Sequence, residues 1–343
     1  MIKKFFVILI LVGLLTACGG QNSLSIFAPA DMFPSDLLAN FENETGIRIN
    51  YQHFDAGENI IARLASGRGR FDLVITNDYI VETAISGDLA KKLDHSRLYN
   101  FSNINPLFQG LFFDPDDDFS IPFGVNVHTI VYDPARINIS INNYLDLWHP
   151  NLRQRLGLPN NYRVINGMAL RVMGYSYNTD NPDIIQNAGS FLGMLIPNIS
   201  VIQNENLEEI LVSGEIAAAV LSAPQVIRAK TARPELRLVL PSEGTGFNIM
   251  AAFIPSRARN VDAAYTFLNY ILDARNGAKC FESSGLFSTF SASNINVSED
   301  MLHFLAALED SVERGLTEIM KPLNAETQAM FNNVWTEFMS AVR

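Results

Sequence analysis

The chain is poor in the residue types that mark several common classes of protein. Its 343 residues include two cysteines, Cys18 and Cys280, and five histidines. Cys18 belongs to an N-terminal signal, so Cys280 has no partner for an intramolecular disulfide or a cysteine-based metal site, and we expect it in the core. The histidines are scattered without metal-ligand spacing, and the GxSxG, P-loop and GxGxxG motifs are absent. The sequence therefore indicates neither an enzyme, a cofactor site nor a metal site.

Positive charge is also scarce. The formal net charge is −11 at pH 7, which argues against nucleic acid as a partner because the phosphates would be repelled. The apolar fraction of 48% and the charged fraction of 18% are typical of a globular chain. Its length is enough for two lobes, each with a core of its own.

A hydrophobic run long enough to cross a bilayer is missing at the N-terminus. Lys3 and Lys4 precede an apolar run over 5–15, shorter than the roughly 20 residues of a spanning helix. Such a segment is typical of a secretory signal, although an uncleaved anchor stays open. Residues 15–18 (LTAC) resemble the bacterial lipobox, which implies a signal peptide over 1–17, lipidation of Cys18 and a tether over 18–23. The mature protein would then be lipid-anchored in the periplasm or at the cell surface.

What the chain does have is an alternation of strand and helix patterns. Residues 24–87 read as βαβαβα, which predicts a doubly wound α/β lobe. The same alternation of strand and helix patterns is repeated over residues 129–240, and the tail from about residue 298 is predicted to be helical. We expect the chain to cross between lobes near 125–126 and 246–248. The predicted division is 24–125 plus 249–295 for lobe 1, and 126–248 plus 296–343 for lobe 2.

Five segments resemble the spermidine/putrescine-binding protein family in order and spacing. They are residues 41–47 (FENETGI), 71–74 (FDLV), 113–123 (FDPDDDFSIPF), 144–150 (YLDLWHP) and 168–179 (MALRVMGYSYNT). The resemblance implies a type II periplasmic binding fold, in which a cleft between two α/β lobes closes on a solute. It also implies delivery of that solute to the permease and ATPase of an ABC importer, by a monomer. Within these segments, Trp148 and Tyr175 are interpreted as packing anchors.

The resemblance also places candidate ligand contacts at loops that border the cleft. Several of these positions differ from the family, which usually has acidic or aromatic residues there, so a polyamine would depend on Asp31 and Asp78. The candidate residues are Asp31, Met32, Asn77, Asp78, Tyr79, Asn161, Ser222, Asn248 and Met250.

Two alternatives keep the fold and change the role. The asparagines could bind a different small organic solute, neutral or zwitterionic, or the chain could be a sensor or surface lipoprotein with a degenerate cleft. Iron is disfavoured because the chain has no adjacent tyrosines, which iron-binding relatives usually offer.

Overall fold

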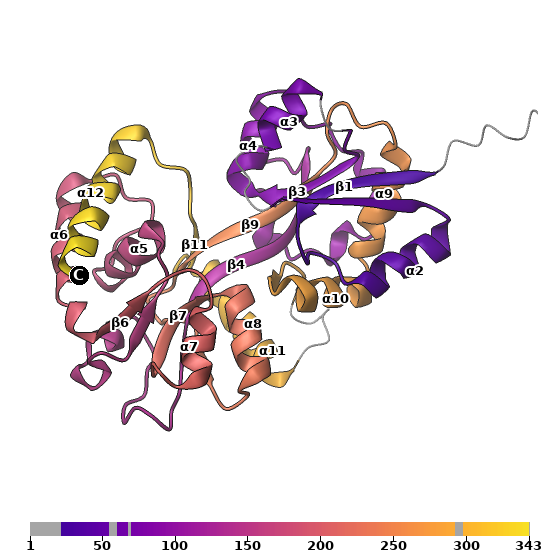
Figure 1. The fold of residues 1–343 in the computed structure, drawn as a ribbon. Coiled ribbons are helices and arrows are strands. Elements are labelled where there is room, and N and C mark those ends of the chain that lie inside the picture. Colours follow the sequence, from indigo (N-terminus) through magenta and orange to yellow (C-terminus); the bar gives the residue numbers. More distant parts are fainter. Residues whose placement is uncertain (1–21, 55–59, 68–69, 292–297, 343) are drawn as a thin grey trace, which may run out of the picture.

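The computed structural model describes residues 22–54, 60–67, 70–291 and 298–342. These residues form two α/β lobes joined by long strands that run from one lobe into the other (Figure 1). The first lobe contains β1, β2 and β3, and the second contains β5, β6, β7 and β8. The predicted two-lobed α/β architecture is confirmed.

Lobe 1 is built from a parallel sheet with helices around it. Strand β1 pairs in parallel with β2 on one side and with β3 on the other. Gly46 ends α2 with φ of 69°, a left-handed conformation that glycine adopts at little cost. The elements are β1 (Ser23–Pro29), α2 (Ser35–Thr45), β2 (Arg48–Phe54), α3 (Ile60–Ser66), β3 (Leu73–Asn77), α4 (Asp78–Ser86), α9 (Val261–Ile271), α10 (Ala274–Ser284) and β10 (Phe287–Ser288).

Lobe 2 repeats this plan. Its strand β5 pairs in parallel with β6 and β7, and helices pack on both faces of the sheet (Figure 1). The elements are β5 (Leu156–Leu158), α5 (Tyr162–Val172), α6 (Pro182–Gly193), β6 (Ile199–Ile202), α7 (Leu207–Ser213), β7 (Ala218–Ser222), α8 (Ala223–Ala232), β8 (Arg237–Val239), α11 (Glu299–Glu313) and α12 (Ala325–Val342). Short 3₁₀ helices lie in the connections: His95–Arg97, Phe101–Asn103, Pro106–Phe108, Leu145–Trp148, Pro150–Leu152 and Ile196–Asn198.

Two long strands belong to both lobes. Strand β4 (Ser120–Tyr132) pairs with β9 (Gly246–Phe253) over its first part and with β7 and β8 over its second part. The change of partner falls between Val127, opposite Phe247, and His128, opposite Ser222. A short strand, β11 (Glu318–Ile319), adds to the start of β9. The sheet order is β2-β1-β3-β9-β4-β7-β5-β6.

The apolar core divides differently from the lobes. One core fills lobe 1 and continues beneath α7, α8 and α11, where Phe287 and Phe304 have ring centroids 4.8 Å apart. The other core lies between α5, α6, α12 and the facing side of the lobe 2 sheet. We expected each lobe to have a core of its own. Lobe 2 has one only on the face of its sheet covered by α5, α6 and α12, because its other face shares the core of lobe 1. Cys280 is buried in the first core as expected, and burial raises the pKa of its thiol to about 12.

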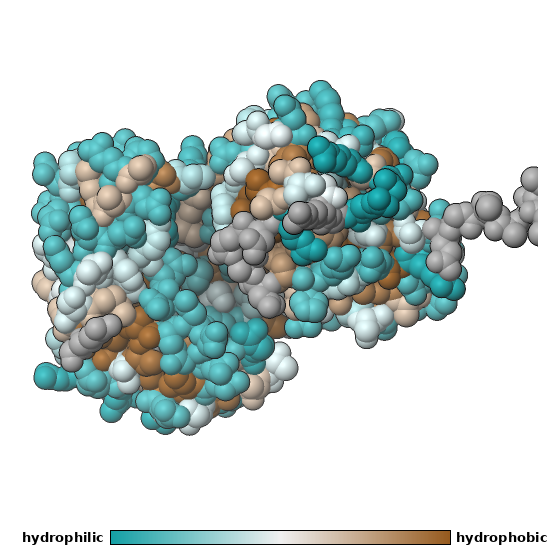
Figure 2. All heavy atoms as spheres, turned by 45° about the horizontal axis from the view of Figure 1, so that its top comes forward, coloured by the Kyte–Doolittle hydropathy of each residue, from teal (hydrophilic) through white to brown (hydrophobic). Residues whose placement is uncertain are grey.

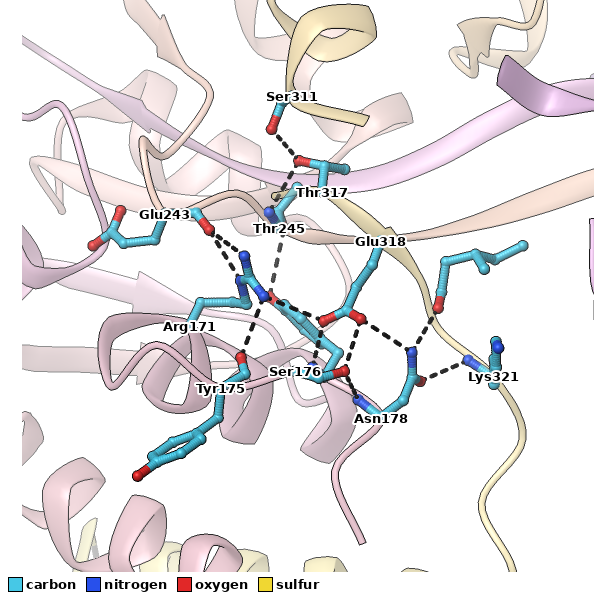
Figure 3. A network of polar contacts seen from close by, with 12 residues as sticks. Arg171, Tyr175, Ser176, Asn178, Glu243, Thr245, Ser311, Thr317, Glu318 and Lys321 are labelled. Carbon is cyan, nitrogen blue, oxygen red and sulfur yellow. Dashed lines mark hydrogen bonds and ion pairs between the residues drawn. The ribbon is translucent and has the colours of Figure 1, made fainter. Parts of the chain in front are cut away.

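The two residues expected to act as packing anchors, Trp148 and Tyr175, differ in their contacts and exposure. Trp148 stacks on Phe191 with ring centroids 4.7 Å apart, as an anchor should. The expectation for Tyr175 is wrong, because its side chain is 39% exposed. Gly174, with φ of 80°, ends the preceding helix and turns the chain so that the Tyr175 ring points away from the neighbouring polar groups (Figure 3).

Candidate functional site

A single row of polar side chains crosses the sheet where the two lobes meet. Strand pairing places Asn77 opposite Met250, Asn126 opposite Asn248, and His128 opposite Ser222. Directly paired residues share one face of a sheet, and so do residues two apart along a strand. All six side chains therefore lie on the same face, and we call Asn77, Met250, Asn248, Asn126, His128 and Ser222 the polar row.

Exposure separates the polar row from the rest of its strands. Each of β3, β4, β7 and β9 is buried along its length except at the five polar positions of the row. Met250 is 7% exposed. The recess between the lobes visible in Figure 2 agrees with a cleft at this junction, on a face that is otherwise mostly hydrophilic. The polar row thus forms the floor between two lobes.

Two atoms of the row are buried without a hydrogen-bond partner, Oδ1 of Asn126 and Nδ1 of His128. Unpaired buried polar atoms are uncommon in folded proteins, and they mark places where a ligand or water completes the structure. Burial also lowers the pKa of His128 to about 4, so its imidazole is neutral at physiological pH. At neutral pH no side chain of the row itself carries a formal charge.

The Asp78 carboxylate, at the start of α4, lies next to the row. It is 1% exposed and accepts hydrogen bonds from the backbone N–H groups of Ile249 (2.9 Å) and Tyr79 (2.8 Å), and from Nδ2 of Asn248 at 3.5 Å. Burial raises the pKa of Asp78 to about 6 despite these hydrogen bonds. This carboxyl group is therefore mostly ionised at pH 7, at the lobe 1 end of the row.

Three further candidate residues of lobe 1, Asp31, Met32 and Tyr79, differ in how exposed they are. Asp31 lies in a left-handed turn with φ of 58° and lines a cavity of about 430 Å³ between the lobes, opposite Pro224 and Arg228 of α8. Met32 is 3% exposed and belongs to the core of lobe 1. Tyr79 is 44% exposed in the first turn of α4.

Asn161 and Ser222 are the N-cap residues of α5 and α8 in lobe 2. Oδ1 of Asn161 accepts from the N–H groups of Arg163 (3.0 Å) and Val164 (3.3 Å), which caps α5. Ser222 forms a capping box with Gln225 at the start of α8. Both side chains therefore have a structural role at the edge of the cleft.

The structure brings together five of the nine candidates directly. Asn77, Asn248, Met250 and Ser222 share the polar row, and Asp78 contacts it through Asn248. Sequence reasoning missed Asn126 and His128, although a polar residue at every second position of an otherwise apolar strand is a signal that could have found them.

A second polar cluster lies beside the junction and is fully paired (Figure 3). The Glu318 carboxylate accepts from Oγ of Ser176 (2.7 Å), the N–H of Tyr177 (2.7 Å) and, at 3.4 Å, from Nη1 of Arg171. Arg171 also donates from Nε (2.9 Å) and Nη2 (2.7 Å) to the carbonyl of Glu243. We call these residues the Glu318 network. It ties β11, and hence the start of β9, to the segment after α5.

Within the described residues, neither a metal site nor a membrane-spanning helix is found. Among the residues described, no group of three or more His, Cys, Asp or Glu side chains is placed to hold a metal ion. A helix of the length and apolarity needed to span a membrane is likewise absent from the described ranges. The larger cavity between β8 and α11, about 590 Å³, holds Lys230, whose Nζ donates to two backbone carbonyls and pairs with Asp300.

The geometry defines a class of protein, a two-lobed binding protein with a polar floor between its lobes. Comparison with known proteins gives the family. The family model described as bacterial extracellular solute-binding protein matches residues 36–301. The chain is 31% identical over 258 residues to the spermidine/putrescine-binding periplasmic protein of Escherichia coli, covering 74% of this chain and 73% of that protein. The chain belongs to the bacterial extracellular solute-binding protein family.

Other similar proteins match a larger share of the chain. The putrescine/cadaverine-binding protein of Pseudomonas aeruginosa is 24% identical, with 98% of this chain and 99% of that protein covered. The structure of a spermidine/putrescine ABC transporter substrate-binding protein from Streptococcus pneumoniae superposes with a TM-score of 0.87 at 24% identity, over 94% of this chain and all of that one. The resemblance to spermidine/putrescine-binding proteins and the type II periplasmic binding fold are thus confirmed.

Proposed function

We propose that this protein captures a polyamine of the spermidine/putrescine class outside the cytoplasm and delivers it to an ABC importer. The observation that carries the proposal is the polar row, which lies between the lobes of a chain whose relatives are named for binding these solutes. Asp78 supplies a carboxylate for an ammonium group, and the exposed ring of Tyr79 supplies an aromatic face. The protein acts by binding, without catalysis.

The test is isothermal titration of the chain from Gly19 onward, without the lipidated Cys18, with putrescine, spermidine and spermine at moderate salt. We expect a dissociation constant of about 1 µM or tighter, equivalent to about −8 kcal/mol. Absence of heat and of a thermal shift with all three would overturn polyamine capture, and would favour another solute or a sensor role.

We propose that the lobes close on the ligand by bending near 125–126 and 246–248, with domain boundaries at 24–125 plus 249–295 and 126–248 plus 296–343. Support comes from β4, which pairs with β9 as far as Val127 and with β7 of lobe 2 from His128 onward. A ligand shifts this equilibrium only through its greater affinity for the closed form. The closed monomer would then dock on the permease, which its ATPase drives.

We propose that lipidated Cys18 anchors the protein to a membrane, in the periplasm or at the cell surface. Cys18 lies outside the described residues, so the proposal rests on the lipobox-like segment 15–18 and on relatives named as periplasmic. A Cys18→Ser variant should move the protein from the membrane fraction to the soluble fraction. Unchanged partition of the variant would contradict the anchor.

A further inference from the structure

The two ends of the polar row differ in charge. At the lobe 1 end, the Asp78 carboxyl group lies within 3.5 Å of the Asn248 amide. At the lobe 2 end, His128 and Ser222 are uncharged, and Oγ of Ser222 donates to the neutral amide of Gln225 at 3.1 Å. Gln225 in turn donates to the backbone carbonyl of Asn204 at 2.9 Å. No carboxylate takes part in this lobe 2 chain of contacts.

Glu318 and Arg163 are charged groups beside the lobe 2 end of the row. Glu318 lies opposite Gly246, two residues before Asn248, but its carboxylate already accepts hydrogen bonds from Arg171, Ser176 and Tyr177. Arg163 lies in the first turn of α5, two residues after Asn161, and donates from Nη2 to Oδ1 of Asn178 at 3.1 Å. Its Nη1 is buried without a partner, and no ion pair includes it within the described part of the chain. Asn178 Oδ1 also accepts from the N–H of Lys321, next to Met320, whose carbonyl lies 3.5 Å from the Asn248 amide. The Arg163 guanidinium also lies over the Phe331 ring, 5.4 Å from its centroid, and Nδ2 of Asn178 donates to Glu318 at 3.5 Å. These contacts therefore leave no unengaged carboxylate for an ammonium group at the lobe 2 end of the row.

A ligand with two ammonium groups fits this asymmetry poorly. An ammonium group taken out of water without a charged partner is costly, and Asp78 can pair with only one. The unpaired Asn126 Oδ1 and the neutral imidazole of His128 offer ordinary hydrogen bonds instead. An uncharged group that both donates and accepts satisfies them without a desolvated charge.

We propose that the preferred ligand carries one cationic nitrogen, held near Asp78, and an uncharged amide at its other end, held by Asn126, His128 and Ser222. A diamine acylated on one nitrogen has this chemistry. The inference rests on the proposed function, since it takes the polar row as the solute site, and it names the form of polyamine that the site selects.

The first test compares three ligands with the same four-carbon spacing on the mature wild-type protein by isothermal titration. We expect N-acetylputrescine to bind about tenfold more tightly than putrescine, because the acetamide removes one unpaired ammonium group. Equal or tighter binding of putrescine would overturn this inference and leave polyamine capture standing. Tighter binding of 4-aminobutanoate than of N-acetylputrescine would also overturn it, in favour of a zwitterion. Binding of none of the three would overturn this inference, and the titrations with spermidine and spermine would then decide whether polyamine capture stands.

The second test places a carboxylate at the lobe 2 end. Ser222→Asp keeps a good helix N-cap, so the fold of α8 is preserved. The variant should reverse the preference, with putrescine gaining about tenfold over N-acetylputrescine. The matched control is Ser298→Asp, the same change at the N-cap of α11, away from the row. An unchanged ligand ratio in Ser222→Asp, or an equal change in both variants, would contradict the placement of the amide.

Discussion

The polar row and the Glu318 network lie on neighbouring stretches of β9 but differ in how they are satisfied. Glu318 accepts hydrogen bonds from four groups at 2.7–3.5 Å, and Arg171 donates from three nitrogens. The row leaves Asn126 Oδ1 and His128 Nδ1 without partners. A network in which every polar group is hydrogen-bonded rigidifies a fold. Polar groups left without partners next to a cleft can instead hydrogen-bond a ligand. Four variants can test that distinction.

Removing Glu318 should have the largest effect. Glu318→Ala leaves Arg171, whose side chain is only 12% exposed, without its carboxylate. We expect the free energy of unfolding to fall by about 3 kcal/mol. Urea denaturation at pH 7.5 measures this, with Glu313→Ala on the exposed side of α11 as a control that should change it by less than about 0.5 kcal/mol. A loss no larger than the control would mean that the network is not structural.

Asp78→Asn should change how stability depends on pH. Burial raises the pKa of Asp78 from 3.8 to about 6, so its stabilising contribution is complete below pH 3.8 and is lost as pH rises through 6. His128, with its pKa lowered from 6.5 to about 4, contributes stability above pH 6.5 that is lost as pH falls through 4. The two contributions, each about 3 kcal/mol, oppose one another in the wild type.

In Asp78→Asn only the His128 contribution remains. Acidification from pH 7 to pH 4 should therefore destabilise the variant by about 2.5 kcal/mol more than the wild type. Urea denaturation of both proteins at the two pH values measures the difference. Parallel pH profiles would show that Asp78 titrates normally in the folded protein.

Asn126→Ala should weaken binding and leave the fold intact. Loss of one hydrogen bond to the ligand should lower affinity about tenfold, while the free energy of unfolding stays within about 0.5 kcal/mol. Titration with the best ligand, alongside the exposed-site control Asn138→Ala, gives the comparison. A variant that loses stability and keeps its affinity would assign Asn126 to the scaffold.

Tyr79→Leu should have the smallest effect. Its half-exposed ring offers a cation–π contact worth about 0.5–1 kcal/mol, a loss of roughly threefold in affinity. Tyr79→Phe should restore most of it, because the aromatic face survives. Equal affinities of the Leu and Phe variants would exclude the ring as a contact.

Much of the fold follows from local patterns. The strand over Ser23–Pro29 and the helix ended by Gly46 can be predicted because period and helix-ending residues act within a few positions. The shared core was not predictable, since it depends on contacts such as that between Phe287 and Phe304, which no local pattern encodes.

The site was predictable only in part for a related reason. Asn77 and Ser222 end strands, and loops at the carboxyl ends of parallel strands border the crevice. Asn126 and His128 lie inside a strand, and their exposure arises only because β4 leaves one sheet and enters another. The cross-strand neighbours that complete the row, Asn248 and Ser222, are set by register, which the sequence of β4 alone does not contain.

The pairing of β3 with β9 also bears on the order in which the chain can fold. Val74 lies opposite Phe253, so the sheet of lobe 1 is incomplete until β5, β6, β7 and β8 of lobe 2 have been synthesised. Contacts between such distant parts of a chain slow folding. Lobe 1 therefore cannot complete its own sheet as it is made, although its first three strands are the first described strands to be synthesised.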